Sequence, residues 1–227
     1  NGDYFTSSYT SLFTGSSHGI YPTIADNWSV GNYPTSSLGL HFDWKIAKGL
    51  TFKNSFCNGQ ASTSWNKVFR FNPKHDGIIN VSELSYKQDE KTNTLIGEYH
   101  VGFLYVDEEN DNKTNSYSVF GLIEQPFYKG SFNIGMLLQG GYSPKKDNDT
   151  YGYYGIGIVG GNIIKEDDEI GIIINRALYK GDEKETDVEI TYNLPLLKHL
   201  SIQPAIHFIN TNDKNNTIGL LRFNFEF

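Results

Sequence analysis

The segment TIGLLRFNFEF, residues 217–227, alternates aromatic and polar side chains. Successive side chains of a strand point to opposite faces, so Phe223, Phe225 and Phe227 would share one face and the polar residues between them the other. The last residues of a soluble domain tend to be polar and frayed. A terminal phenylalanine on the apolar face is instead expected where the last strand of a barrel has to pair and face lipid.

The same alternation recurs along the chain. In LGLHFDWKI (38–46), the leucines, Phe42, Trp44 and Ile46 share one face, opposite Gly39, His41, Asp43 and Lys45. The pattern predicts about eleven strands and no long helix. These strands are 37–46, 49–57, 77–87, 93–107, 114–127, 130–143, 151–163, 168–180, 184–194, 199–210 and 216–227. Strands of globular proteins average roughly five or six residues, whereas about ten are needed to cross a bilayer at a tilt.

Two kinds of all-β protein fit such alternation, a soluble sandwich and a membrane barrel. Glycines and ionisable groups gather on the polar faces, as a water-filled interior requires. Aromatic residues stand near the ends of the apolar faces, as in the girdles of outer-membrane barrels. They are Trp44, Tyr105, Phe127, Tyr128, Tyr192, Phe208 and Phe227. We therefore expect an antiparallel transmembrane β-barrel of the outer-membrane type.

Composition limits the function classes. The chain has 227 residues, of which 38% are hydrophobic, and its mean hydropathy is −0.44. No apolar run approaches the roughly 18 residues of a transmembrane helix. The net charge of −7 argues against nucleic acid as a partner, because a phosphate-neutralising basic patch is missing. Cys57 is the single cysteine, which excludes an internal disulfide framework.

The predicted connections alternate between two ends of the barrel. Counted back from residue 227, the connections on the periplasmic side are 47–49, 87–92, 128–130, 165–168 and 194–198. The outer connections are 58–76, 107–113, 144–150, 180–183 and 210–216. The longest, 58–76, falls on the outer side, where barrels of this class carry their long loops. Residues 1–36 also fall on the outer side.

Several segments resemble the carbohydrate-selective porins, the OprB-type family. They are NYPTSSLGLHFDWKIAKGLTFKNSFCNG (32–59), GEYHVGFLYV (97–106), YGYYGIGIVGGNIIKEDDEIGIIINRA (151–177) and ETDVEITYNLPLLKHLSIQPAIHFI (185–209), followed by TIGLLRFNFEF. GDYF (2–5) resembles the point where the family's chain leaves a strand and enters an inward-folded loop that narrows the pore. Each segment is loose alone, but their order and spacing together are fairly specific.

The resemblance implies one β-barrel domain over residues 1–227, with a constriction-type loop at 1–36 and barrel strands at 37–227. Family barrels have about sixteen strands, and bacterial single-chain barrels have an even number. We therefore expect that an odd number of N-terminal strands precedes this sequence; the alternative is a short relative of the family with a smaller barrel. The implied function is passive, sugar-selective diffusion of small saccharides across the outer membrane of a Gram-negative bacterium.

The candidate pore-lining residues fall into two groups. Aromatic side chains in the N-terminal loop, whose faces would stack on sugars, are Tyr9, Tyr21, Trp28 and Tyr33. Inward polar residues of the strands, which would set a field across the lumen and bind polyhydroxyl solutes weakly, are His41, Asp43, Glu98, His100, Glu189 and Arg222, with Lys45, Lys53, Asp187, Gln203 and His207 on the same face. The alternative is that the aromatics form a small core against the wall and the polar groups solvate it or brace it in pairs.

The sequence indicates no enzyme, metal or cofactor. Asp187 and Glu189 are spaced so that a glycosidase pair is possible, but nothing else supports one. Glu98 and His100 lack a third metal ligand. The expected partners are small saccharides and outer-membrane lipid, with other outer-membrane proteins or further copies of the chain left open. Two other functions stay open: a barrel with a plugged lumen that serves as a structural partner, and a soluble all-β glycan-binding module.

Overall fold

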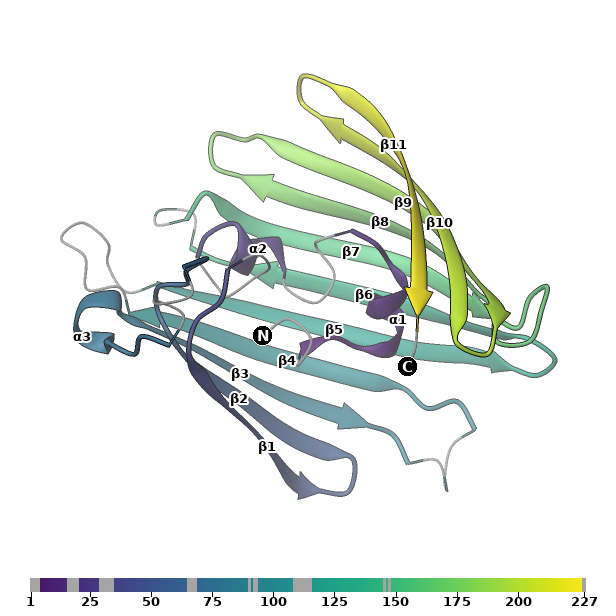
Figure 1. Cartoon of the computed structure of the whole chain (residues 1–227), viewed down its shortest axis with the longest axis horizontal. Helices are drawn as coiled ribbons and strands as arrows, with labels where there is room; N and C mark the ends of the chain where they lie inside the picture. The colour runs from purple at the N-terminus through teal and green to yellow at the C-terminus, as the bar shows by residue number, and fades with distance from the viewer. Residues whose placement is uncertain are drawn as a thin grey trace.

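A computed structural model describes residues 5–15, 21–28, 35–64, 69–89, 91, 94–107, 116–144, 146 and 148–225. These residues form one eleven-stranded antiparallel sheet in which each strand pairs with its neighbours in sequence (Figure 1). The strands are β1 (Gly39–Ala47), β2 (Leu50–Asn58), β3 (Ile78–Lys87), β4 (Glu98–Asp107), β5 (Ser116–Lys129), β6 (Asn133–Tyr142), β7 (Thr150–Gly161), β8 (Glu169–Tyr179), β9 (Lys184–Leu197), β10 (Leu200–Thr211) and β11 (Asn215–Phe225).

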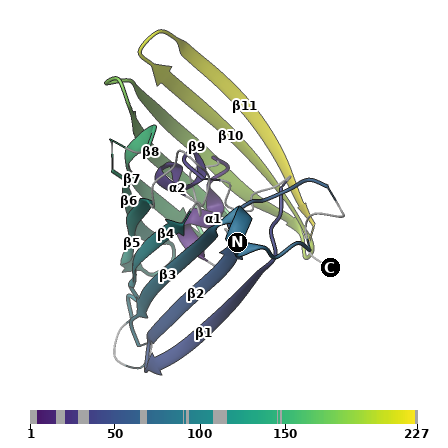
Figure 2. The same cartoon turned by 90° about the vertical axis from the view of Figure 1, so that its left-hand side faces the viewer.

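The sheet curls into a trough, with β1 and β11 as its two edges in the part that the structure describes (Figure 2). Its strands have 9 to 14 residues, which is the length needed to cross a bilayer at a tilt. Connections at one end, here called the turn end, include residues 48–49, 130–132, 162–168 and 198–199. Connections at the other end, the loop end, include residues 59–77, 180–183 and 212–214. Short helix α3 (Pro73–Asp76) lies in the longest of these.

All eleven predicted strands are confirmed, with two notable changes at the turn end. The strand expected over 93–107 begins only at Glu98. The strand expected over 184–194 continues to Leu197, so the predicted connection 194–198 shortens to residues 198–199. Proline has no N–H for the ladder and is tolerated at bulges. The register between β9 and β10 shifts next to Pro195, and the β5–β6 register shifts next to Pro126 in the same way.

The two faces of the sheet have the polarity of a membrane barrel. On the convex face, large apolar side chains are open: Leu40 is 76% exposed and Trp44 is 63% exposed. On the concave face, several ionisable groups are covered, with Glu83 at 1% and Glu189 at 0%. This arrangement reverses that of a soluble protein, where charged groups are rarely buried and large apolar patches are rarely left open. Among the described residues no second sheet covers the apolar face, whereas the soluble sandwich alternative requires one.

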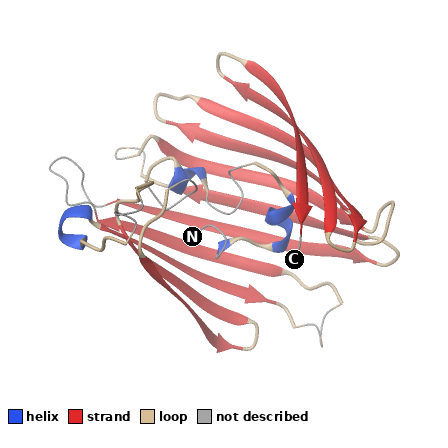
Figure 3. Cartoon of the chain, in the orientation of Figure 1, coloured by secondary structure: helices blue, strands red, loops and turns tan. Residues whose placement is uncertain are grey.

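Two short helices lie on the concave face. Figure 3 shows these helices in blue against the red strands. They are α1 (Ser8–Leu12) and α2 (Pro22–Ala25), both in the segment predicted as an inward-folded loop. None of the helices that the structure describes is long and apolar enough to cross a membrane.

Candidate functional site

The amino end of α1 is fixed to Glu124 on β5. The carboxylate of Glu124 accepts the Tyr9 backbone N–H at 2.7 Å, the Ser8 hydroxyl at 3.0 Å and the Ser7 hydroxyl. Amides in the first turn of a helix have no partner within the helix, so an acceptor from elsewhere has to satisfy them. Glu124 is buried and supplies that acceptor from the barrel wall.

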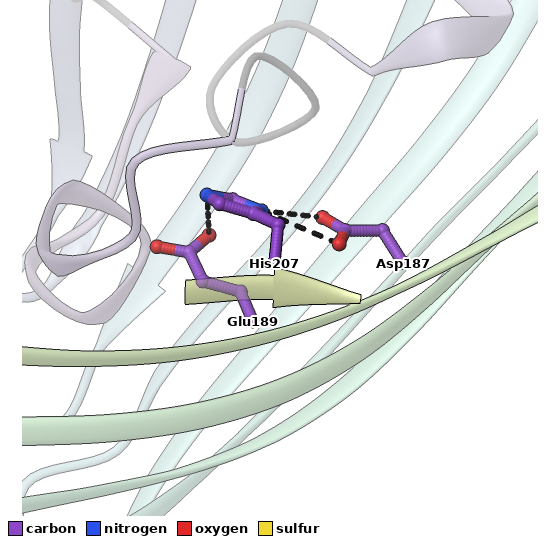
Figure 4. Close-up of side chains that lie close together, drawn as sticks. All are labelled: Asp187, Glu189 and His207. Atoms are coloured by element: carbon purple, nitrogen blue, oxygen red, sulfur yellow. Dashed lines mark hydrogen bonds and ion pairs between the residues drawn. The ribbon is translucent and has the colours of Figure 1, made fainter. Parts of the chain in front are cut away.

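The other end of α1 is fixed to Glu189 on β9. One carboxylate oxygen accepts the Thr14 N–H at 2.6 Å and the Thr14 hydroxyl at 2.8 Å, and the other accepts the Gly15 N–H at 3.1 Å. His207 on β10 pairs directly across from Glu189. Its Nε2 lies 2.9 Å from Thr14 Oγ1. Its Nδ1 lies 3.0 Å from Asp187 Oδ2, and Figure 4 shows His207 between Asp187 and Glu189. Two wall carboxylates therefore hold the chain at the start of α1 and just after its end.

Asp187, Glu189 and His207 also have the composition of a metal site. Each offers a ligand atom, and these atoms lie within 4.8 Å of one another. However, the Glu189 oxygens already accept two amide N–H groups and a hydroxyl, and His207 Nδ1 faces a carboxylate at hydrogen-bonding distance. A metal ion would have to displace these bonds. We interpret the three residues as a hydrogen-bonded anchor for the chain at Thr14.

Apolar side chains on the concave face receive the two helices. Leu12 and Phe13 pack in one buried cluster with residues of β5 to β8, namely Leu122, Leu137, Val159 and Ile173. Tyr21, Ile24 and Trp28 pack in a second cluster with Ile79, Leu104, Val106, Phe120, Tyr153 and Ala177. The Tyr21 and Phe120 rings stack with centroids 5.0 Å apart. The concave face is therefore partly apolar, beneath the N-terminal segment.

Glycines let the helices approach the wall closely. A Cβ atom at Gly171 would lie 2.8 Å from two ring carbons of Phe13, closer than carbon atoms tolerate. At Gly135 it would overlap the Tyr9 side chain, and at Gly141 it would overlap Thr23. Bare backbone at these three places forms shallow sockets for α1 and α2.

Described residues line a cavity at each end of the concave face. The turn-end cavity has a volume of about 270 Å³ and lies beside Ser8 and Tyr9. Its other polar and aromatic lining residues are Glu98, Glu124, Glu169, Lys87, Lys129 and Tyr128. The loop-end cavity has a volume of about 340 Å³ and lies beside Thr14 and Gly15. Its lining includes Asp26, Glu185, Asp187, His207, Tyr153 and Tyr179. These volumes are near the lower end of small-ligand sites, roughly 300–1,000 Å³.

The segment between the cavities carries unusual side-chain chemistry. Burial, together with the charges of Glu124 and Glu169, raises the pKa of Tyr9 to about 12. Burial also raises the pKa of Asp26, although a hydrogen bond from Thr150 opposes the change. The Tyr9 hydroxyl consequently stays protonated at neutral pH and is able to donate a hydrogen bond at the turn-end cavity.

A second histidine on the wall is held by carboxylates on both sides. His100 on β4 has Nδ1 2.8 Å from Glu83 Oε1 and Nε2 2.9 Å from Glu98 Oε1. Lys53 lies 3.3 Å from the same Glu83 oxygen. The network braces β2, β3 and β4 against one another through polar contacts.

The structure brings the predicted site residues to three kinds of position. Tyr9 and Glu98 line the turn-end cavity. Three more lie partly or fully exposed on the concave face, namely His41, Asp43 and Arg222. The Arg222 guanidinium donates a hydrogen bond of 3.4 Å to Gln203 Oε1. Buried in contacts with the protein itself are Tyr21, Trp28, His100 and Glu189. Tyr33 lies outside the described residues. Pore lining stays a prediction for all ten.

Some residues of the site were not predicted. Glu124 was missed because it lies in the 114–127 segment, whose inner face was not analysed for charge. Apolar residues such as Leu104, Leu137 and Ile173 occupy strand positions that point to the same inner face as the polar ones. They were missed because alternation alone predicts polar residues on a water-filled inner face. The glycines of β6 to β8 were read as features of an open lumen, and the structure shows three of them as helix sockets. The signal that could have revealed these contacts is the excess of apolar residues at strand positions that alternate with the lipid-facing ones.

Comparisons with known proteins agree with this architecture. The family model described as "Carbohydrate-selective porin, OprB family" matches residues 1–227. A solved structure, "High pH structure of Pseudomonas putida OprB", is similar with a TM-score of 0.72 and 15% sequence identity. The similarity covers 85% of this chain and 60% of that chain, and at this identity it shows the fold alone. No curated protein matches the chain. Because the family model spans every residue, the chain belongs to the OprB family of carbohydrate-selective porins, channel proteins of the bacterial outer membrane.

Proposed function

We propose that the protein conducts small saccharides passively across the outer membrane, through a lumen narrowed by the N-terminal segment. One observation carries the proposal: residues 5–15 and 21–28 lie against the inner wall, held by hydrogen bonds and by two apolar clusters, with a cavity on each side of α1. The chain spans about 60% of the length of the similar porin structure, so the transport activity is proposed for the intact protein.

Passage would depend on weak contacts at several positions. A channel conducts when solute binding is favourable enough for entry and weak enough for release. The turn-end cavity combines aromatic rings with carboxylates and lysines, which suits the mixed apolar and hydroxylated faces of a sugar. No covalent step is required. We further propose that the turn end faces the periplasm, as the short connections of such barrels do.

The ten predicted residues would then have different roles. Tyr9 and Glu98 would contact the sugar, and His41, Asp43 and Arg222 would line the path beyond the cavity. Tyr21, Trp28, His100 and Glu189 would act by holding the segment and the wall in place, since all four are buried. We make no separate assignment for Tyr33.

Liposome swelling tests the proposal. The intact protein, purified from outer membranes and reconstituted, is expected to speed swelling in isotonic solutions of monosaccharides more than in those of larger saccharides. Tyr9→Ala should reduce the difference between sugars of different size, because it removes the ring beside the turn-end cavity. Tyr154→Ala is the matched control, since Tyr154 lies half exposed on the convex face. Sugar-independent swelling, or no swelling, would contradict the proposal.

A plugged barrel that acts as a structural partner is the second candidate. It is favoured by the burial of Tyr21 and Trp28, which fill the inner face rather than leaving it open. The same assay separates the two functions. A plugged barrel gives no swelling with any saccharide, although the protein is folded and inserted.

A further inference from the structure

The arginine of β8 points to the convex side of the sheet, near the loop end. Asn175 and Ala177, on either side of Arg176, line the loop-end cavity, so the Arg176 side chain points away from it. The register of β8 with β9 places Thr186 directly across from Arg176. Arg176 Nε donates to the Thr186 hydroxyl at 2.9 Å. In the part of the chain that the structure describes, no carboxylate pairs with this guanidinium.

Arg176 belongs to a polar row that crosses neighbouring strands on the convex face. Register pairs join its members in the order Tyr154, Arg176, Thr186 and Asn210, on β7, β8, β9 and β10. Lys184 lies exposed on the same face of β9, nearer to the loop end. The carboxylates of Glu185 and Asp187 point instead into the loop-end cavity. The convex face thus combines two cations with the hydroxyls of Tyr154 and Thr186.

An apolar groove begins directly below the polar row, on the side of the turn end. Its volume is about 440 Å³, and its lining includes Gly160 and the isoleucines at positions 156, 158, 170, 172 and 174. Ile156 and Ile174 are paired with each other and are the next convex pair after Tyr154 and Arg176. From Arg176 to Ile170 the strand runs roughly 20 Å, or about 15 Å in depth at a tilt of about 40°. This depth is half of the roughly 30 Å hydrocarbon core, which is the thickness of one leaflet.

The charge of the polar row selects the occupant of this surface. A cation on the lipid-facing side of a barrel is costly at depth, and the cost falls where the side chain reaches the interface and an anion. A guanidinium matches the oxygens of a phosphate with a planar fork of N–H groups. With Nε engaged by Thr186, the terminal amino groups of Arg176 remain for such an acceptor. A second copy of the chain across a two-fold axis would instead bring two copies of Arg176 together, which is unfavourable.

We propose that the convex face of β7 to β9 binds one molecule of lipid A, the phosphorylated acyl anchor of lipopolysaccharide. Arg176 and Lys184 hold a phosphate, the Tyr154 hydroxyl donates to it, and an acyl chain lies in the isoleucine groove. Lipid A is the source of the phosphate because the loop end faces outward in the orientation proposed above, and lipopolysaccharide forms the outer leaflet. The inference rests on that orientation and does not require an open lumen.

Native mass spectrometry of the intact protein, delipidated in detergent and mixed with purified lipid A, tests the site. The wild-type protein should bind one molecule, and lipid A freed of its phosphates should bind at least about tenfold more weakly. Arg176→Gln should weaken binding of phosphorylated lipid A by a similar factor and leave binding of the dephosphorylated form unchanged. Gly160→Leu fills the groove and should weaken binding of both forms alike. Lys198→Gln, the same loss of charge at the exposed turn end, is the matched control and should bind as wild type does.

Each of the other outcomes overturns the proposal. Equal binding of phosphorylated and dephosphorylated lipid A by the wild-type protein rejects it without any variant, so the test does not depend on how the variants fold. Equal binding of lipid A by wild type and Arg176→Gln rejects the role of the guanidinium. Phosphatidylglycerol that binds as tightly as lipid A would make a phospholipid the occupant, and dimers that persist after lipid A is added would make it a second copy of the chain. Lipid binding does not require sugar passage, so failed liposome swelling would reject the saccharide function and leave the lipid site standing.

Discussion

Replacing Glu124 with alanine is expected to detach the start of α1 from the barrel wall while the sheet stays folded. Glu124 is the acceptor for the Tyr9 amide at 2.7 Å and for the hydroxyls of Ser7 and Ser8. Its contacts in this set all reach the N-terminal segment, 115 to 117 residues away in sequence. The effect should therefore be local to that segment.

The free-energy cost of Glu124→Ala follows from the hydrogen-bond donors that lose their acceptor. An unpaired buried amide costs about 1–3 kcal/mol, and each hydrogen bond to a charged group contributes about 1.5–3 kcal/mol. The Ser7 hydroxyl keeps Thr10 as a partner at 2.9 Å, and the protein no longer has to bury a carboxylate, so part of the loss is recovered. We expect the docked state to lose about 2–4 kcal/mol, which corresponds to a roughly 30- to 1,000-fold change in population.

Hydrogen–deuterium exchange measures this population directly, because local opening sets the exchange rate of protected amides. Peptides that cover residues 5–15 should exchange faster in Glu124→Ala by the factor given above, while peptides from β8 should be unchanged. Glu124→Gln keeps an acceptor for the Tyr9 amide and should exchange less than about tenfold faster than wild type. Equal exchange in wild type and Glu124→Ala, or equal exchange in both variants, would refute the reasoning.

Two further predictions address the socket and a turn. Gly171→Val places a Cβ atom 2.8 Å from Phe13 and 2.9 Å from Leu12, so it should displace the end of α1 at a cost of about 1–3 kcal/mol and raise single-channel conductance. Gly219→Val is the control, because a Cβ atom there has nothing within 4 Å and should leave conductance unchanged. Wild-type conductance in Gly171→Val would contradict the role of Gly171 as a socket for α1. Burial raises the pKa of Asp168, but hydrogen bonds from Tyr192 and from the amides of residues 163–165 outweigh it and lower the pKa overall. Its contribution to stability is therefore complete above the unfolded value of about 3.9 and is lost as pH falls through the lower folded value. Thermal unfolding of wild type and Asp168→Ala should differ by a constant amount above about pH 5 and converge below about pH 4; a difference that persists unchanged to lower pH would contradict this.

The strands could be predicted because the period of two is dictated by two unlike solvents. Every position of β1, from Gly39 to Ala47, faces either lipid or the concave side, so the sequence repeats the alternation without interruption. The exception at Pro195 has a local cause. A proline usually ends a strand in prediction, but a bulge beside it removes the ladder bond that proline cannot make.

The site was less predictable because its contacts join residues that are distant in sequence. The alternation places Glu189 and His207 on the inner face, and the register places them opposite each other. That Thr14 would lie between them depends on how the N-terminal segment folds back, and nothing in residues 1–36 alternates. The same holds for Phe13 and Gly171, whose contact spans most of the chain.

The carboxylates and the apolar side chains of the inner wall hold the N-terminal segment in different ways, for a physical reason. A segment without strand pairing has to satisfy its backbone amides in a space that water can enter, where a neutral hydrogen bond contributes little net stability. Charge-assisted bonds are about twice as strong as neutral ones, so Glu124 and Glu189 hold the amides of Tyr9, Thr14 and Gly15 more firmly than an amide or hydroxyl would. Burying such carboxylates is costly unless neighbouring groups compensate. The apolar clusters beneath α1 and α2 offset that cost by removing aromatic surface from water, and they set the depth at which the segment lies. The carboxylates thus orient the segment and the apolar clusters set its depth. We therefore predict that altering either the carboxylates or the apolar clusters alone changes the width of the lumen beside the segment.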